Sequence, residues 1–233
     1  MLFDQAEYDL RCEWGPQGLL HLAPVSDAIV IVDVLSFSTA VDIAVANGAS
    51  VTPAVWTKNS CGRSRDAWSL SPASLLAVPP GTAMVLPSPN GAALCLSTGG
   101  VPAYAACLRN APAVAAHLAG SGKRIAVIPA GERWADDTLR PCLEDWIGAG
   151  AVLSLLPGTR SPEADLAVAA FERFRGDLPG VLSRCGSGKE LIERGFRADV
   201  ELAAEFGVSR AVPMLAGGRF CAAPETESTG QAR

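Results

Sequence analysis

Asp33 has the most conspicuous position for chemistry in this sequence, because it ends an uninterrupted apolar run and hydroxyl side chains follow it. The run at 29–32 is rich in β-branched residues without polar alternation, a pattern typical of a strand buried on both faces. In open α/β sheets, ligands bind beyond the carboxyl ends of the strands. Asp33, with Ser36, Ser38 and Thr39 at the start of an expected helix, is therefore a candidate for metal or anion binding.

Two later segments end in the same way. A strand expected at 83–86 runs into Ser88-Pro89-Asn90-Gly91, and a strand expected at 124–128 runs into Pro129-Ala130-Gly131-Glu132. Taken singly, each is an ordinary turn between a strand and a helix. In a mostly parallel sheet all three turns converge on one edge, so together they predict a site there.

Glu144 and Asp145 supply further carboxylates within a helix expected at 138–155, with Pro141 in its first turn. Asp145 shares a helix face with Gly148 and Ala149, and small residues beside a carboxylate predict close packing around it. A buried Asp145 would be either paired or metal-bound. The alternative is a solvated acidic first turn that the helix dipole favours.

Composition narrows the class of protein. The chain has 233 residues, is 49% hydrophobic and 18% charged, and carries a net charge of −5 without any Lys/Arg run. These values favour a globular protein and exclude the basic footprint of a nucleic-acid binder. No apolar run approaches the ~20 residues that span a bilayer, and the first residues lack signal-peptide features. We therefore expect a cytoplasmic protein without nucleic-acid or membrane partners.

Thiol and imidazole chemistry is not favoured. The seven cysteines are scattered and form no C-x-x-C pair, so most are expected to be small core residues. Of the two histidines, His117 falls on an expected helix surface, and neither lies in a polar cluster. A segment at 185–190 fails the P-loop pattern, because Ser183 and Glu190 stand where glycine and Ser/Thr are needed. Hydrolysis would need carboxylates, hydroxyls, backbone amides or a metal.

Alternating strand and helix signals from residue 28 onward predict an α/β fold, three-layered α/β/α, with a largely parallel or mixed sheet. Ser38 or Thr39 is expected to cap a helix that ends at Asn47-Gly48. We expect one domain over 1–221, or two lobes divided near 100–120, with loop at 57–80 and a disordered tail at 222–233. The remaining expected strands are 50–55, 103–107 and 211–214, and the remaining expected helices follow Gly91 and Asn110 and cover 162–175, 187–194 and 199–206.

A series of short motifs resembles the 2-phosphosulfolactate phosphatase family. They span roughly residues 28–214, and their order and spacing are more specific than any one of them. The motifs are Asp33-Val34-Leu35-x-x-Ser38-Thr39, Asn47-Gly48-Ala49, Ser88-Pro89-Asn90-Gly91, Leu108-Arg109-Asn110-Ala111, Ala130-Gly131, Glu144-Asp145 with Gly148-Ala149-Gly150, Ser183-x-x-Gly186 with Gly195 and Asp199, and Val212-Pro213.

The resemblance implies a Mg²⁺-dependent hydrolase that cleaves the phosphate ester of a small anionic 2-hydroxy acid on an α/β/α fold. This chain departs from the family pattern where Ser36-Phe37 replace an arginine and Ala92 follows Asn90-Gly91. The segment at 57–76 is also shortened, with Leu70-Ser71-Pro72 in place of an Asn-Ser-Pro motif. Without that arginine, the cation for the acid end must come from Arg109, Arg133 or Arg140.

These observations combine into one expected mechanism, phosphate monoester hydrolysis assisted by Mg²⁺. One or two carboxylates from Asp33, Glu144 and Asp145 would suffice to hold the ion, with Glu132 as a weaker candidate. Asp33 could act as ligand, base or nucleophile. The expected substrate-binding residues are Ser36, Ser38, Thr39, Ser88, Asn90, Gly91, Arg109, Asn110, Gly131, Glu132 and Arg140. The competing hypothesis is a catalytically impaired member that binds an anionic metabolite or a protein partner; a homodimer is a further expectation.

Overall fold

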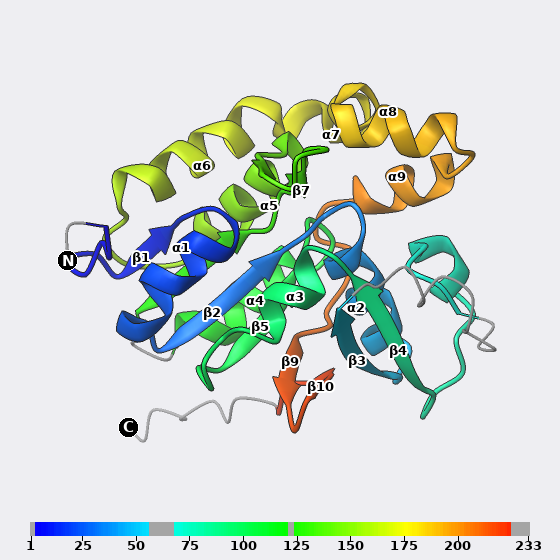
Figure 1. The fold of residues 1–233 in the computed structure, drawn as a ribbon, viewed down its shortest axis with the longest axis horizontal. Coiled ribbons are helices and arrows are strands. Elements are labelled where there is room, and N and C mark those ends of the chain that lie inside the picture. Colours follow the sequence, from blue (N-terminus) through cyan, green and yellow to red (C-terminus); the bar gives the residue numbers. More distant parts are fainter. Residues whose placement is uncertain (1–2, 56–67, 121–123, 225–233) are drawn as a thin grey trace, which may run out of the picture.

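In the computed structural model, which describes residues 3–55, 68–120 and 124–224, an eight-stranded sheet forms the middle layer (Figure 1). The strand order is β1-β6-β2-β5-β9-β10-β3-β4. Strands β1, β6, β2 and β5 run parallel, as do β3 and β4, whereas β9 and β10 join these two groups through antiparallel pairs. The mixed sheet and its two helical layers confirm the predicted three-layer α/β/α class.

The strands are short and most lie deep in the protein. Every residue of β2 and β6 is buried, as the apolar runs predict. Their bounds are β1 Leu10–Cys12, β2 Ala28–Val32, β3 Ser50–Val55, β4 Ala83–Ser88, β5 Ala103–Ala106, β6 Ile125–Pro129, β9 Pro213–Ala216 and β10 Arg219–Ala222, with a separate hairpin of β7 Glu132–Arg133 and β8 Leu139–Arg140.

The helices cover both faces of the sheet (Figure 1). One layer contains α4 Ala111–Ala119, α5 Leu143–Leu153, α6 Pro162–Phe174, α7 Leu178–Arg184, α8 Gly186–Glu193 and α9 Arg197–Ala203. The other contains α1 Gly15–Leu22, α2 Phe37–Ala46 and α3 Gly91–Cys95; short 3-10 turns lie at Ala23–Val25, Pro72–Leu75 and Arg175–Asp177.

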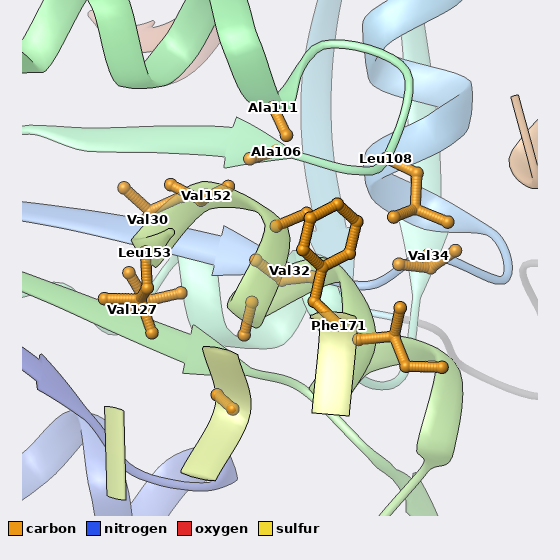
Figure 2. Packing of buried hydrophobic residues seen from close by; sticks show 14 of the residues in the cluster. Val30, Val32, Val34, Ala106, Leu108, Ala111, Val127, Val152, Leu153 and Phe171 are labelled. Carbon is orange, nitrogen blue, oxygen red and sulfur yellow. The ribbon is translucent and has the colours of Figure 1, made fainter. Parts of the chain in front are cut away.

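Alternate residues of β2 face opposite layers, which explains its lack of polar alternation. Val30 and Val32 belong to the core on the α5 side, whereas Ile29 and Ile31 belong to the core on the α2 side. Figure 2 shows the first of these cores, in which side chains from three parallel strands gather with Phe171 of α6. Burying apolar side chains on both faces holds the carboxyl end of β2 in a fixed position.

Two helix starts were predicted wrongly. The helix expected from Thr138 begins at Leu143, and residues 138–140 pair in the β7–β8 hairpin instead. Pro141 is the physical reason, because the residue before a proline avoids helical geometry. Helix α2 has Ser36 at its N-cap, so Ser38 and Thr39 lie within the helix and do not cap it.

Of the remaining sequence-based predictions, some are confirmed, and some fall outside the described residues. The strand at 50–55 and the helix end at Asn47-Gly48 are confirmed, with Gly48 at φ +79°. Elements β1, α1, α7 and β10 were missed. Much of the loop expected at 57–80 and most of the tail expected at 222–233 lie outside the described residues. Among the helices that the structure describes, none has the length and apolarity needed to cross a bilayer.

Candidate active site

Asp33 lies directly after β2, where three chain segments meet. Its Oδ1 accepts a hydrogen bond from the Phe37 backbone N–H at 3.2 Å, at the start of α2. Its Oδ2 accepts from the Gly91 N–H at 2.9 Å and from the Ser88 hydroxyl at 3.5 Å. The carboxylate therefore caps α2 and fixes the turn after β4.

Gly91 is required by this close approach. A Cβ atom at that position would lie 2.7 Å from Asp33 Oδ2 and 2.6 Å from the Phe37 ring. Neither neighbour can move freely, because both are buried. The glycine in the Asn90-Gly91 turn thus allows a backbone N–H to reach the carboxylate.

Asp145 reaches the same edge from the first turn of α5. Its Oδ1 accepts from the Val34 N–H at 2.7 Å, and its Oδ2 accepts from the Gly131 N–H at 2.8 Å. Gly131 has φ +67°, a backbone conformation that favours glycine. Since Val34 follows Asp33, the structure brings the three predicted turns and the α5 carboxylate together, as expected.

The two aspartates form an acidic centre in a dry environment. Burial, followed by the charge of Glu132, raises the pKa of Asp33 to about 7. Burial and the charge of Asp33 raise the pKa of Asp145 well above its usual range. Among the described residues, neither carboxylate forms an ion pair with a lysine or arginine side chain. Bringing both to the charged state therefore calls for a cation.

The two glutamates differ in how they join this centre. Glu144 is 2% exposed, and its charge helps to raise the pKa of both Asp33 and the Cys185 thiol. Glu132 is half-buried, and its Oε2 accepts from the Asn90 side-chain amide at 2.8 Å. Burial raises the pKa of Glu132 as well.

The predicted hydroxyls mostly bond the protein backbone. Ser38 Oγ accepts from the Asp33 N–H at 3.0 Å and donates to the Ile31 carbonyl at 3.1 Å. Thr39 Oγ1 donates to the Val34 carbonyl at 2.7 Å. Both side chains are fully buried, so they position the Asp33 turn. Ser36 is half-buried at the N-cap and makes no side-chain capping bond, which leaves its hydroxyl as the candidate for substrate contact.

Arg109 and Asn110 lie in the turn after β5, at the same edge of the sheet as Asp33, but their side chains bond other partners. Arg109 Nε donates to Asp42 in the second turn of α2 at 3.1 Å, and its Nη1 pairs with Glu205. The Asn110 side chain accepts from the Cys107 N–H at 2.8 Å and donates to the Ala105 carbonyl. These contacts make both residues part of the turn between β5 and α4.

Arg140 is the predicted cation that does lie beside the acidic centre. Its charge acts on Glu132, and its Nη2 donates to the Ser187 hydroxyl at 3.0 Å. The guanidinium also lies 5.6 Å from the centre of the Trp134 ring. Arg140 is thus held at the junction of β8 and α8, and within the described ranges it forms no ion pair with a carboxylate.

The donor atoms suit a hard divalent cation, although they do not form a closed cage. No group of three His, Cys, Asp or Glu side chains within the described residues is arranged to hold a metal ion. Asp33 Oδ1 and both Asp145 oxygens each accept one hydrogen bond and keep a lone pair for a metal ion, whereas Asp33 Oδ2 accepts two. Mg²⁺ prefers oxygen ligands and keeps several waters, so one or two carboxylates are enough.

A cavity of about 490 Å³ lies against the same turns. It is lined by Asn90 and Glu132 and, on its other sides, by Trp14, Leu94 and Leu139. This volume is typical of small-molecule sites. Trp14, which stacks on Trp146 at 4.9 Å, had no sequence signal, because residues before 28 gave no recognisable pattern. Likewise, no sequence pattern indicated that the backbone N–H groups of Val34 and Phe37 bond the two aspartates.

The fold and this edge define a class: an α/β/α protein with a buried carboxylate centre at the carboxyl ends of its parallel strands, which is where α/β proteins bind their ligands. The sequence profile of the 2-phosphosulpholactate phosphatase family matches residues 68–218. The chain belongs to this family, as the motifs indicated.

Three relatives carry the same description, probable 2-phosphosulfolactate phosphatase. The protein from Carboxydothermus hydrogenoformans is 33% identical over 136 residues, which cover 57% of this chain and 55% of that protein. The one from Symbiobacterium thermophilum is 31% identical over 121 residues, half of each chain. The one from Gloeobacter violaceus is 35% identical over 71 residues, 30% of each. The chain spans about half the length of the curated relatives it matches.

Proposed function

We propose that this protein hydrolyses the phosphate ester of a small anionic 2-hydroxy acid, with Mg²⁺ as cofactor. The observation that carries the proposal is the pair of buried carboxylates, Asp33 and Asp145, whose hydrogen-bond donors among the described residues are backbone N–H groups and one hydroxyl. A stable fold gains little from two uncompensated buried acids. Family membership supports the same reaction, because the relatives are named as probable phosphatases.

The reaction requires a water oxygen to bond to phosphorus while the ester P–O bond breaks. The departing alkoxide takes up a proton, and inorganic phosphate is released. Asp33, whose pKa is about 7, is suited to take a proton from the attacking water near neutral pH. Its orientation is set by Gly91 and Phe37, so little reorganisation is needed during the reaction.

Asp33 and Asp145 are the residues that would hold Mg²⁺, with Glu144 behind them. When bound, the ion would neutralise charge on the transferring phosphoryl group. The hydroxyls of Ser36 and Ser88 and the amide of Asn90 are candidates to orient the phosphate oxygens.

Arg140 is the residue proposed to bind the carboxylate of the substrate acid. It is half-buried beside Glu132 and carries a charge that no ion pair neutralises among the described residues. Arginine binds carboxylates through two parallel hydrogen bonds, which fixes the orientation of the acid. Arg109 is less suited, because Asp42 and Glu205 already occupy its guanidinium.

The test is release of inorganic phosphate from a panel of 2-phospho-2-hydroxy acids, measured with Mg²⁺ and with a chelator. We expect turnover that depends on the metal and that Arg140→Gln reduces mainly through a higher KM. Arg109→Gln is the matched control and should leave KM unchanged. Absence of turnover on every ester by a folded protein would contradict the proposal and favour a protein that only binds an anionic metabolite.

A further inference from the structure

The cavity beside the acidic centre indicates which kind of substrate this family member takes. This inference rests on the proposed function. Its lining includes Asn90 and Ala130, which directly precede the two glycines whose N–H groups bind Asp33 and Asp145. A ligand whose phosphate reaches the carboxylates therefore has this cavity as the adjoining space for the rest of the molecule.

Apolar side chains form most of the cavity wall. Trp14 and Pro16 contribute from the start of α1, Leu94 from α3 and Leu139 from β8. Trp14 is fixed by its stacked contact with Trp146, at an interplanar angle of 6°. These apolar side chains offer contact to an apolar group and no hydrogen bond to a charged one, whereas Gln17, Asn90 and Ser97 are the uncharged polar side chains of the lining.

The charges that line the cavity disfavour an additional anion. Arg133, its one lining cation in the described part of the chain, is bonded to Asp137 at 3.0 Å. Glu132 is the remaining lining charge, so these three side chains sum to −1. A sulfonate placed here would lie near a carboxylate without an unpaired cation.

We infer that the cavity receives the substituent on carbon 2 of the substrate acid and that this substituent is apolar and uncharged. The phosphate and the acid's own carboxylate remain at the acidic centre and at Arg140.

Two esters of nearly equal size test the inference directly. One is the phosphate ester of 2-hydroxy-4-methylpentanoate, which has an isobutyl substituent; the other is 2-phosphosulfolactate, which has a sulfomethyl substituent. We expect kcat/KM to be at least ~10-fold higher for the isobutyl ester, since apolar contact and absent repulsion act in the same direction. A preference for the sulfonate would overturn the inference while leaving the phosphatase function intact.

A cation introduced at the cavity should shift this preference. Ser97 lines the cavity and is exposed, so Ser97→Lys is compatible with folding. We expect this variant to reduce the preference for the isobutyl ester by ~10-fold. Ala169→Lys, at an exposed position on α6 outside the cavity lining, is the matched control and should keep the wild-type preference.

Failure of the proposed function can be told apart from failure of this inference. If neither ester is hydrolysed, calorimetric titration of both esters into the wild-type protein and into Ser97→Lys decides the matter. The cavity assignment is supported if the wild-type protein binds the isobutyl ester more tightly than 2-phosphosulfolactate and if Ser97→Lys reduces this difference in affinity. Equal binding of the two esters, or binding of neither, would overturn it.

Discussion

Two buried aspartates close to α2 have quite different surroundings. Asp33 lies just before the helix, and Asp42 lies in its second turn. Asp42 is fully buried and accepts from the Arg109 guanidinium at 3.1 Å and from the Ser209 hydroxyl at 2.6 Å. Asp33 is 5% exposed, and no cationic side chain in the described part of the chain donates a bond to it. Burial raises the pKa of both; backbone N–H bonds oppose the rise in Asp33, whereas the Ser209 hydroxyl and the Arg109 guanidinium oppose it in Asp42.

The difference separates a structural acid from one that is available for chemistry. The ion pairs of Arg109 with Asp42 and Glu205 connect α2, the β5–α4 turn and the end of α9. These residues therefore have a structural role. Asp33 and Asp145 hold turns together by accepting bonds from backbone N–H groups. Among the described residues, no lysine or arginine side chain pairs with either of them. We expect substitutions in the first group to affect stability and those in the second to affect activity.

The largest expected effect is on turnover. Asp145→Asn removes one charge and one N–H acceptor from the acidic centre, and we expect kcat for phosphate release to fall by ~1000-fold. The hydrogen bond to one of the two N–H groups can remain, so the fold should persist. Steady-state kinetics with circular dichroism checks this; near-normal kcat in a folded variant would remove Asp145 from the mechanism.

Asp42→Asn should have the opposite profile. It removes the charge of the fully buried Asp42 and leaves the half-buried Arg109 with a weaker partner, and we expect a loss of about 3 kcal/mol in the free energy of unfolding. Activity of the folded fraction should stay within about twofold of wild type, since the pair lies outside the acidic centre. Urea denaturation measures the free energy of unfolding, and kinetics under folding conditions measure the activity. A loss of activity without a loss of stability would contradict the assigned difference between Asp42 and Asp33.

The pH dependence of stability should follow the acidic centre. Because the folded pKa values of Asp33 and Asp145 are raised, the native state holds protons that the unfolded chain has released. The contribution of Asp33 to stability is complete below about pH 4 and is lost as pH rises through about 7, and that of Asp145 is lost in the same direction. We expect Tm to fall by roughly 5 °C between pH 5 and 8.

Added Mg²⁺ should offset this fall at pH 8 more than at pH 5, because the ion binds the deprotonated carboxylates. Differential scanning fluorimetry at both pH values, with Asp33→Asn and Asp42→Asn as comparison variants, measures the effect. A Tm that rises from pH 5 to 8 without metal would contradict the assigned direction.

The smallest expected effect concerns the hydroxyl that supports Asp33. Ser38→Ala removes an acceptor for the Asp33 N–H and a donor to the Ile31 carbonyl, at a cost of about 1 kcal/mol. Thr39→Val removes the bond to the Val34 carbonyl and the contact with the Cys107 thiol, leaves the bonds of Ser38 in place and keeps the shape of the side chain, so it serves as the control. Denaturant midpoints compare the two; a larger loss for Thr39→Val would mean that Ser38 does not anchor the turn.

The sequence was most informative where local chemistry and burial act in the same direction. The all-apolar β2 and the turns at Gly91 and Gly131 could be predicted, because each has a strong local signal. The separation of Arg109 from Arg140 could not, since it depends on pairing between distant elements: Arg109 meets Asp42 and Glu205, whereas Arg140 follows β8 into the acidic centre.

Two kinds of error have the same origin. Ser38 and Thr39 have the side chains of helix caps, but Asp33 accepts the Phe37 N–H and the hydroxyls turn back to β2 and its loop. The wall at Trp14 depends on a stack with Trp146, which is 132 positions away in the numbering of the chain. Long-range packing of this kind has no counterpart in local spacing.

The most direct test compares phosphate release by Asp33→Asn with that by wild type and Asp42→Asn, all shown to be folded and assayed with Mg²⁺ at pH 8. The account predicts a loss of at least ~100-fold for Asp33→Asn, with Asp42→Asn close to wild type. Equal activities for Asp33→Asn and wild type would contradict it, because the carboxylate after β2 would then have no part in the reaction.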